Sequence, residues 1–251
     1  MKVIRKLSLY TFFTLFLIGC KTSVTHEFHK TYLNSVIDDE IQENKELARK
    51  IEPYKHQIDS IMSQHVTYAN EDYTKSGYSS NEGNLLADLI LDYSKKYANK
   101  HNLSLPDFCL LNLGGVRTII PKGEVTVGSV FEVAPFENEV VFVQMNGILM
   151  QEMFEYLQKE KVGHPLAGIK IVYNQNQTLV AEIAGKPFDK NKTYWVATND
   201  YLMTGGDRMY FFTKSEHKII PKIILRDALI EEMSTYKTLP NSNEIRLQFQ
   251  N

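Results

Sequence analysis

The sequence predicts a mixed α/β (α+β) fold, with a single layered domain that follows a leader and a helical lead-in. Segments in which apolar residues recur every three or four positions alternate irregularly with short apolar runs typical of strands. Two of these runs, 169–173 and 179–184, flank the polar stretch Asn174–Gln177, which is typical of a hairpin turn. Because a hairpin joins antiparallel strands, the pattern favours a mixed sheet over a doubly wound parallel one.

Residues 1–19 are predicted to be a lipoprotein signal peptide. Three basic residues among the first six precede an apolar segment, 7–18, that is too short to span a bilayer. The sequence from Leu17 to Cys20 then matches a bacterial lipobox, which predicts acylation of Cys20 and anchoring in the cell envelope. Lys21 after the cysteine favours the outer membrane. An ordinary leader or a short N-terminal anchor helix is the alternative.

Removing residues 1–19 from the 251-residue chain leaves 232 residues, enough for one substantial core or two small ones. The removed segment holds three of the 28 basic residues and no acidic ones, so 25 basic side chains remain beside 30 acidic ones. A net charge near −5 argues against nucleic acid as a partner. With Cys20 acylated, only Cys109 remains, so we expect no intrachain disulfide and a buried thiol among apolar neighbours.

The segment 20–43 is predicted to be a tether, and a domain is expected from residue 44 to residue 251. His26 and His29 lie in this tether without the two further ligands that a metal site needs. A helical pattern follows over 44–65. It consists of apolar residues at three- and four-residue spacing, namely Leu47, Ile51, Tyr54, Ile58 and Ile61. Pro53 falls inside it, which predicts two helical pieces or a kink.

Further along the chain, apolar spacing predicts a helix over 84–98 that opens at Gly83-Asn84. Buried strands are expected over 108–113, 139–145 and 194–198. A helix follows the second of these strands, with its inward face made of Leu149, Met153, Phe154 and Leu157. A last helix is expected within 220–233.

Four turn segments concentrate polar or aromatic residues. They are Gly83-Asn84, Asn112–Arg117, Pro135–Asn138 and Asn199–Asp207. The N-terminus of a helix at Gly83-Asn84 would offer N–H groups to an anion. Glycines such as Gly114, Gly115 and Gly206 let a ligand approach the backbone closely.

The side chains of these turns suit a nucleotide or a nucleoside. Phe136 and Tyr201 would stack on a flat base, and the amide of Asn138 would bind its edge. Asp207 would accept hydrogen bonds from sugar hydroxyls, and Arg117 would grip phosphate. Each residue also has a structural alternative: a core position for either ring, a helix cap or turn for Asp207, and a surface salt bridge for Arg117.

These segments resemble the C-terminal, substrate-binding domain of the 5′-nucleotidase family. The resemblance runs from about residue 44 to the end and includes the sequences 51–55, 83–88, 112–117, 135–138 and 197–207. It implies a compact α/β unit that holds the base between Phe136 and Tyr201. It further implies base or ribose hydrogen bonds at Asn138 and Asp207, and a wall near the phosphate at Asn112 and Arg117.

The sequence departs from the family pattern at three places. Leu113 stands where another glycine is usual, and Arg208 follows Asp207 where a glycine is usual. The stretch before Gly83, where the family often has arginines that reach the substrate, contains only one basic residue, Lys75, within 75–80. Phosphate recognition is therefore expected to be weaker or different.

The largest departure concerns catalysis. Family enzymes have an N-terminal metallophosphatase domain with two metal ions, whose ligands occur in motifs such as Asp-x-His and Asn-His-Glu. Neither motif occurs here, and no room for such a domain is expected before residue 44. No catalytic residue and no metal ligand are therefore assigned, and divalent metals are expected on a separate metallophosphatase chain. The alternatives are a stand-alone nucleoside-binding lipoprotein receptor without catalysis and a scaffold that has lost its ligand.

Overall fold

A computed structural model describes residues 42–174 and 179–250. The predicted signal peptide, the lipidation site Cys20 and the tether up to residue 41 lie outside the described residues. The chain divides into two units, 1–48 and 49–251, and the first is described only from residue 42. None of the helices in the described part combines the length and apolar character needed to cross a bilayer.

A five-stranded sheet lies at the centre of the second unit, with the strand order β10-β4-β9-β2-β5. Its strands are β10 (Lys218–Ile219), β4 (Val140–Met145), β9 (Tyr194–Asn199), β2 (Phe108–Leu110) and β5 (Leu166–Ala167). Neighbouring strands are antiparallel except β2 and β9, which are parallel. The predicted mixed α/β fold is confirmed.

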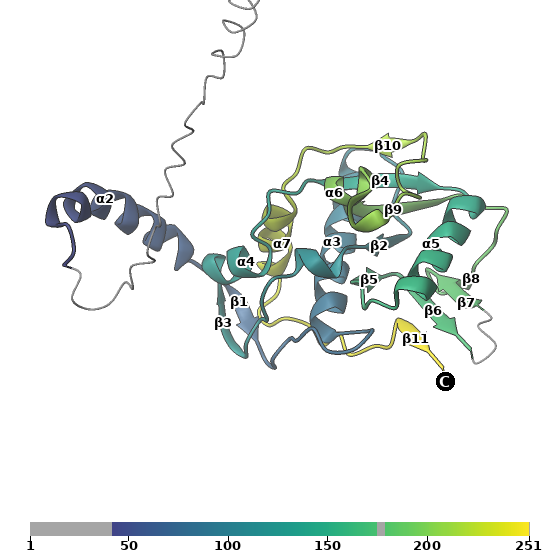
Figure 1. Ribbon diagram of the computed structural model, residues 1–251, viewed down its shortest axis with the longest axis horizontal. Helices are drawn as coiled ribbons and strands as arrows, with labels where there is room; N and C mark the ends of the chain where they lie inside the picture. The colour runs from purple at the N-terminus through teal and green to yellow at the C-terminus, as the bar shows by residue number, and fades with distance from the viewer. Residues whose placement is uncertain (1–41, 175–178, 251) are drawn as a thin grey trace, which may run out of the picture. The chain divides into compact units, whose positions relative to one another are not determined.

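Alternating side chains of this sheet supply two separate hydrophobic clusters. Cys109, Phe142 and Ala197 pack with α3 (Asn81–Lys100), α4 (Val127–Val133) and α7 (Leu225–Met233) on one face. Phe108 and Val141 point to the other face, where α5 (Gly147–Glu160) and a second sheet cover them. Because successive strand residues face opposite sides, continuous apolar runs are buried on both faces. Helices α3 and α7 lie side by side against the sheet (Figure 1).

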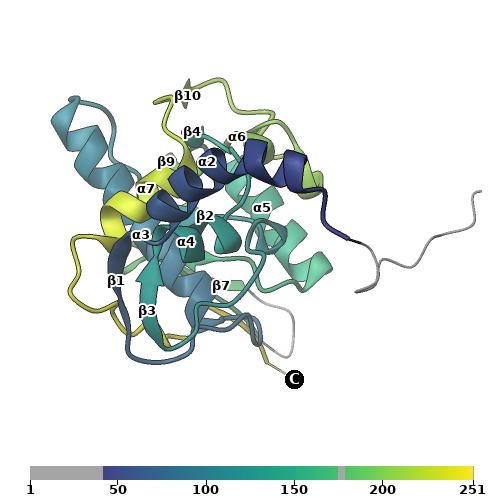
Figure 2. The ribbon, with the colours of Figure 1, turned by 90° about the vertical axis from the view of Figure 1, so that its left-hand side faces the viewer.

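The second sheet has the order β11-β6-β7-β8. Its strands are β11 (Leu247–Phe249), β6 (Ile169–Tyr173), β7 (Leu179–Ile183) and β8 (Lys186–Pro187). The predicted hairpin is confirmed as the antiparallel pair β6–β7, with its turn at 175–178 outside the described residues. A separate ribbon pairs β1 (His65–Ala69) with β3 (Gly123–Thr126), as Figure 2 shows.

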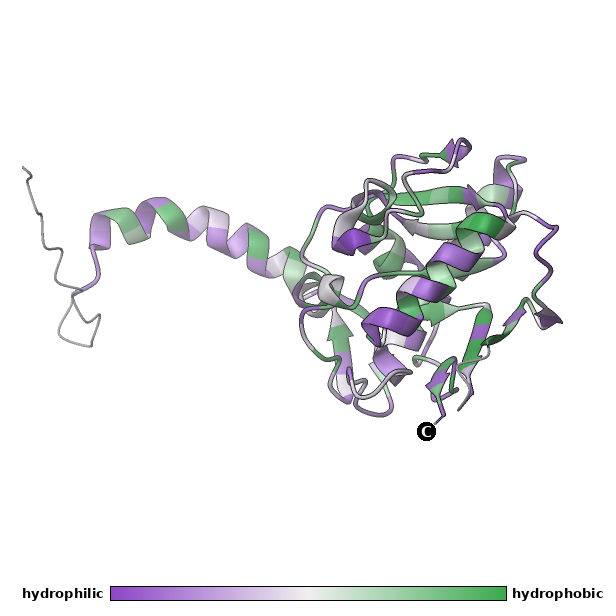
Figure 3. Cartoon of the chain, turned by 45° about the vertical axis from the view of Figure 1, so that its right-hand side comes forward, coloured by the Kyte–Doolittle hydropathy of each residue, from purple (hydrophilic) through white to green (hydrophobic). Residues whose placement is uncertain are grey.

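Helix α2 (Lys45–Met62) is continuous through Pro53, so the predicted division into two helical pieces is wrong, and the alternative of a kink stays a prediction. Proline has no backbone N–H, so one carbonyl of the preceding turn lacks its helical partner. Every residue near Pro53 on this helix is exposed, so water can donate to that carbonyl. Figure 3 shows apolar residues recurring along α2 among polar ones. The predicted apolar residues Ile51, Tyr54, Ile58 and Ile61 are all exposed, by 45 to 69%.

Helix α3 begins earlier than predicted, after Ser80. The Oγ of Ser80 accepts the N–H of Gly83 at 3.0 Å, so Gly83 and Asn84 lie inside the first turn and not at its opening. The Asn84 amide donates to the carbonyl oxygens of Ser242 and Glu244 at 2.8 and 2.7 Å. The predicted anion site at Gly83-Asn84 is therefore wrong, because the Gly83 N–H that an anion would need already donates to the capping Ser80 side chain.

One other boundary differs from the sequence-based expectation, because the strand expected over 108–113 ends at Leu110. The helix expected within 220–233 is confirmed as α7, and the turn Pro135–Asn138 connects α4 to β4. The sequence analysis did not predict α4, because a helix of seven residues is too short to show a recognisable apolar period.

Candidate functional site

Three of the four turn segments meet at one edge of the central sheet. Strands β2 and β9 are parallel neighbours, so the turns that follow them leave at the same edge. Strand β4 runs antiparallel to β9 and pairs Val140 with Asn199, so the turn before β4 reaches that edge as well. A hydrogen bond of 3.2 Å from Asn199 Nδ2 to Asn112 Oδ1 joins the first two turns.

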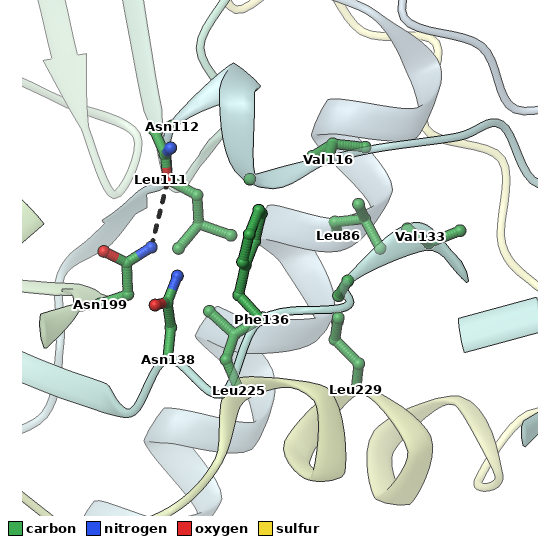
Figure 4. A pocket seen from close by; sticks show the side chains of 12 residues that line it. Leu86, Leu111, Asn112, Val116, Val133, Phe136, Asn138, Asn199, Leu225 and Leu229 are labelled. Carbon is green, nitrogen blue, oxygen red and sulfur yellow. Dashed lines mark hydrogen bonds between the residues drawn. The ribbon is translucent and has the colours of Figure 1, made fainter. Parts of the chain in front are cut away.

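Phe136 and Asn138 border a small apolar pocket at this edge (Figure 4). Asn112, Gly115 and Asn199 contribute to its wall, and the remaining lining is mostly aliphatic. Its volume is about 30 Å³, which leaves room for a water molecule or two but not for a base. The Phe136 ring is 46% exposed, so a base has space only on the outer side of this ring.

Arg226 on α7 holds the turn that carries Phe136. Arg226 Nη1 donates to the carbonyl oxygens of residues 134, 135 and 136 at 3.3, 3.1 and 3.4 Å. Its guanidinium lies 3.9 Å from the centre of the Phe131 ring, and the side chain is 7% exposed. The sequence analysis missed this residue. The sequence did contain a signal for it. Arg226 lies three positions before Leu229 and seven before Met233, which places a charged side chain on the buried face of the helix.

Residues 113–115 form a 3₁₀ turn, η1 (Leu113–Gly115), that leads to Arg117. Arg117 Nη1 donates to the Gly114 carbonyl at 3.4 Å, and its guanidinium lies 5.8 Å from the centre of the Phe136 ring. Within the described residues Arg117 makes no ion pair with a carboxylate. A cation beside an aromatic ring, without a carboxylate partner, remains available to an anionic ligand.

The corner from Asn199 to Asp207 is built by its own side chains. Asn199 Oδ1 caps the short helix α6 (Asp200–Met203) by accepting the N–H of Leu202 at 2.8 Å. Tyr201 lies flat against Gly206, where an added Cβ would come within 2.4 Å of the ring, so only glycine fits. The Tyr201 hydroxyl donates to Asp207 Oδ1 at 2.9 Å.

Asp207 adopts a left-handed conformation, with φ of 50°, inside η2 (Gly206–Arg208). Tyr156 on α5 donates its hydroxyl to the Asp207 carbonyl at 2.9 Å and so holds this strained residue from the opposite side. Tyr156 was not singled out by the sequence analysis, since a tyrosine within a helical pattern is typical of a core position.

A larger cavity, which we call the cationic cavity, brings Arg117 and Asp207 together. Its volume is about 450 Å³, and Lys75, Gly114 and Arg208 also line it. Tyr201 and Gly206 adjoin it through Asp207. The Phe136–Tyr201 clamp stays a prediction: both rings are partly exposed, by 46 and 43%, and neither of these two pockets is lined by both.

Buried His164 and exposed Lys75 both support the walls of the site. The N–H of Leu113 donates to His164 Nδ1 at 3.2 Å, and burial lowers the pKa of this histidine to about 4. The imidazole is therefore neutral at pH 7 and has its proton on Nε2. Lys75 Nζ donates to the carbonyl oxygens of Val116 and Arg117, both at 3.2 Å.

Glu82 on α3 is fully buried, and its carboxyl oxygens make no hydrogen bond of ordinary geometry with the residues that the structure describes. Burial raises the pKa of Glu82 to about 7, and the charge of Lys75 opposes this rise. In the part of the chain that the structure describes, no three His, Cys, Asp or Glu side chains are grouped so as to hold a metal ion.

The chain resembles known proteins in both sequence and fold. The family model of the 5′-nucleotidase C-terminal domain matches residues 62–214. The trifunctional nucleotide phosphoesterase protein YfkN of Bacillus subtilis (strain 168) is 27% identical over 202 residues, which cover 72% of this chain and 13% of that protein. A 5′-nucleotidase of Vibrio cholerae is 25% identical over 195 residues, which cover 74% of this chain and 33% of the relative.

Among solved structures, the 5′-nucleotidase precursor from Thermus thermophilus superimposes with a TM-score of 0.68 at 20% identity. The match covers 82% of this chain and 43% of that chain, and it shows a shared fold. The chain thus spans less than half the length of each of these three proteins. Because the family model covers more than half of the sequence, the chain belongs to the 5′-nucleotidase family, of which it contains the C-terminal domain.

Proposed function

We propose that this chain recognises a nucleotide or nucleoside and works with a separate metallophosphatase chain in nucleotide breakdown. The observation that carries the proposal is the sheet edge at which the turns of Asn112, Asn138 and Asn199 meet. Family membership supports the class of ligand.

In this proposal the base stacks on the exposed faces of Phe136 and Tyr201, and the Asn138 amide binds its edge. Asp207 accepts hydrogen bonds from the ribose, in an orientation that the Tyr201 hydroxyl already holds. Arg117 and Asn112 orient the phosphate, and Gly114 and Gly115 leave the backbone open to it. These residues bind and orient the ligand.

Hydrolysis requires a second component in this proposal. The sequence contains neither Asp-x-His nor Asn-His-Glu. Divalent metals on the partner would supply a metal-activated water. No metal-binding role is assigned to a residue of this chain.

The exposed apolar face of α2 supports a partner chain over a stand-alone nucleoside receptor. This face consists of Ile51, Tyr54, Ile58 and Ile61, and α2 ends where the match to the C-terminal domain begins, at residue 62. In a protein that contains both domains, the preceding domain joins on this side of the matched region. An exposed apolar face at that position suits the docking of a separate metallophosphatase chain in place of that preceding domain.

A direct test compares nucleotidase activity with divalent metal for the purified chain alone, for a candidate metallophosphatase alone, and for the mixture. We expect turnover of AMP only in the mixture, or a large increase over the phosphatase alone. Robust activity of this chain by itself would overturn the split enzyme. Calorimetry with adenosine tests the binding function separately, because it needs no partner.

We further propose that the chain is anchored to the outer membrane through acyl chains on Cys20. The lipobox sequence and Lys21 support this placement.

A further inference from the structure

We propose that Asp200 is a positioning residue that fixes the spacing between the two aromatic faces proposed for the base, Phe136 and Tyr201. This inference rests on the proposed function, and it adds the residue that links the two turns on which these rings lie. Asp200 itself does not contact the base in this proposal. It acts through hydrogen bonds to the backbone of both turns.

The Oδ1 of Asp200 accepts two backbone N–H groups from different parts of the chain. One is the N–H of Tyr201 at 2.9 Å, the residue that carries the second ring. The other is the N–H of Glu139 at 3.0 Å, directly after the turn Pro135–Asn138 that carries the first ring. The backbone N–H of Asp200 also donates to the Glu139 carbonyl at 3.0 Å. These three hydrogen bonds join the two proposed faces.

Strand pairing alone does not determine how the two rings lie relative to each other. The ladder between β4 and β9 ends with the pair Val140 and Asn199, and both rings lie beyond this pair. Asp200 extends the contact past the ladder, because it bonds Glu139 through its backbone and its side chain together. Asp200 therefore lies at the point where the two turns separate.

The turn Pro135–Asn138 is attached on its other side to α7. Arg226 holds the carbonyl oxygens of residues 134 to 136, and the N–H of Leu225 donates to the Asn138 carbonyl at 2.8 Å. A turn held in this way moves as one piece. The link at Asp200 then sets its distance from the corner that begins at Asn199.

The spacing of two stacking faces has to be precise. A base between two rings needs them about 7 Å apart, which is twice the contact distance of about 3.5 Å between carbon atoms. A gap of about 0.5–1 Å on one side already loses a quarter to a half of the dispersion attraction. The Phe136 and Tyr201 rings are 46 and 43% exposed, so core packing holds each of them only in part. Hydrogen bonds to their backbone therefore have to supply the remaining precision.

The test measures adenosine affinity by NMR titration for wild type and for variants of Asp200. Asp200→Ala removes both side-chain hydrogen bonds, and we expect the affinity to fall about fivefold, since part of the stacking is lost. Asp200→Asn keeps a carbonyl oxygen that can accept both N–H groups, so its affinity should stay within about twofold of wild type. Asp200→Ser, whose side chain is one atom shorter, should show the same loss as alanine.

Asp189→Ala is the matched control. Asp189 is half-buried like Asp200, and its Oδ1 accepts the backbone N–H of Asn191 at 3.0 Å. It precedes β9, whereas Asp200 follows β9, so the two carboxylates lie at opposite ends of this strand. Adenosine affinity should stay unchanged in Asp189→Ala.

A double variant separates positioning from a general effect on the fold. Once Phe136→Ala has removed one ring, the spacing no longer matters, so adding Asp200→Ala should cost about twofold or less. If Asp200→Ala fails to fold, Asp200→Ser takes its place in this comparison.

Two results would overturn this inference and leave the proposed function intact. The first is wild-type adenosine affinity in both Asp200→Ala and Asp200→Ser. The second is a loss that is equally large with and without the Phe136 ring, since Asp200 would then act on the fold and not on the spacing. Absence of adenosine binding by wild type would instead refute the proposed function, and this inference with it.

Discussion

At the residue scale, Tyr201 has two proposed roles, and substitution by alanine would remove both at once. Its ring is one of the proposed faces for the base, and its hydroxyl holds the carboxylate of Asp207 at 2.9 Å. Phe136 has only the first role, because the carbonyl oxygens of its turn are held by Arg226. The proposed clamp therefore consists of one ring with a polar function and one without.

Substitution of the two rings separates these roles. We expect Phe136→Ala and Tyr201→Ala each to weaken adenosine binding by about 1–3 kcal/mol, the usual effect of losing a stacked ring. Tyr201→Phe keeps the ring and should lose less, about 1 kcal/mol, for the hydrogen bond to Asp207. Calorimetry measures all three, with Tyr68→Ala, a 51% exposed tyrosine on β1, as the control. Unchanged affinity in both alanine variants would contradict the clamp.

His164 and Glu82 make stability depend on pH in opposite directions. Burial lowers the pKa of His164 from 6.5 to about 4, so the unfolded chain takes up this proton first, and stability is lost as the pH falls from 6.5 to 4. Burial raises the pKa of Glu82 from 4.5 to about 7, so the unfolded chain releases this proton first, and stability is lost as the pH rises from 4.5 to 7.

Urea unfolding at several pH values tests this opposition. Glu82→Gln should stabilise the chain relative to wild type by an amount that grows between pH 4.5 and 7, to about 2 kcal/mol. His164→Asn, which keeps an acceptor for the Leu113 N–H, should reduce the loss of stability below pH 6.5. Curves that run parallel to wild type for both variants would show that neither group titrates as stated.

Helix α2 illustrates the limit of periodicity at the element scale. The three- and four-residue spacing correctly predicts a helix with an apolar face, but it does not reveal that this face is exposed. A buried apolar stripe and a stripe that awaits a partner have the same sequence pattern, because both need apolar contact on one side only.

Polar substitutions on this face should separate partner binding from folding. Ile51→Ser and Ile58→Ser replace residues that are 49 and 53% exposed, so the free energy of unfolding of the chain should change by about 0.5 kcal/mol or less. Stimulation of a candidate metallophosphatase should be lost in the double variant. Asp59→Ser, on the polar side of α2, serves as the control and should retain it. Full stimulation by the double variant would exclude α2 as the docking face.

Strand order creates the site at the scale of the whole molecule. The glycine turns at Gly114 and Gly206 lie some 90 residues apart in sequence, and they meet because β2 and β9 are parallel neighbours. Strand β4 then brings Phe136 and Asn138 to the same edge. The binding chemistry thus depends on pairing between distant strands.

Anchoring is also a property of the whole chain and can be tested without disturbing the fold. Cys20→Ser should move the protein from the membrane fraction to the soluble fraction of the cell envelope, because acyl chains on this cysteine provide the proposed anchor. Adenosine affinity should stay unchanged, since the binding residues all lie between 112 and 207. Retention of the serine variant in the membrane fraction would contradict lipidation at Cys20.

Local rules predicted much of the fold and part of the site. The strands β4, β6, β7 and β9, the helix α5 and the hairpin follow from period and turn composition. The missed residues act through partners that are remote in sequence. Arg226 holds carbonyl oxygens about 90 positions away, and His164 binds a backbone N–H 51 positions away. Such contacts leave no periodic trace in a single sequence.

The sequence by itself determined the fold class, the family resemblance and the types of side chain in the turns, because these depend on local spacing and on ordered motifs. The tertiary structure alone decided that Ser80 and not a ligand satisfies Gly83, that the face of α2 is uncovered, and that Lys75, Arg117 and Arg208 share one cavity. The physical reason is that hydrogen-bond satisfaction, burial and charge density depend on distances between atoms, and the packing of remote segments sets those distances.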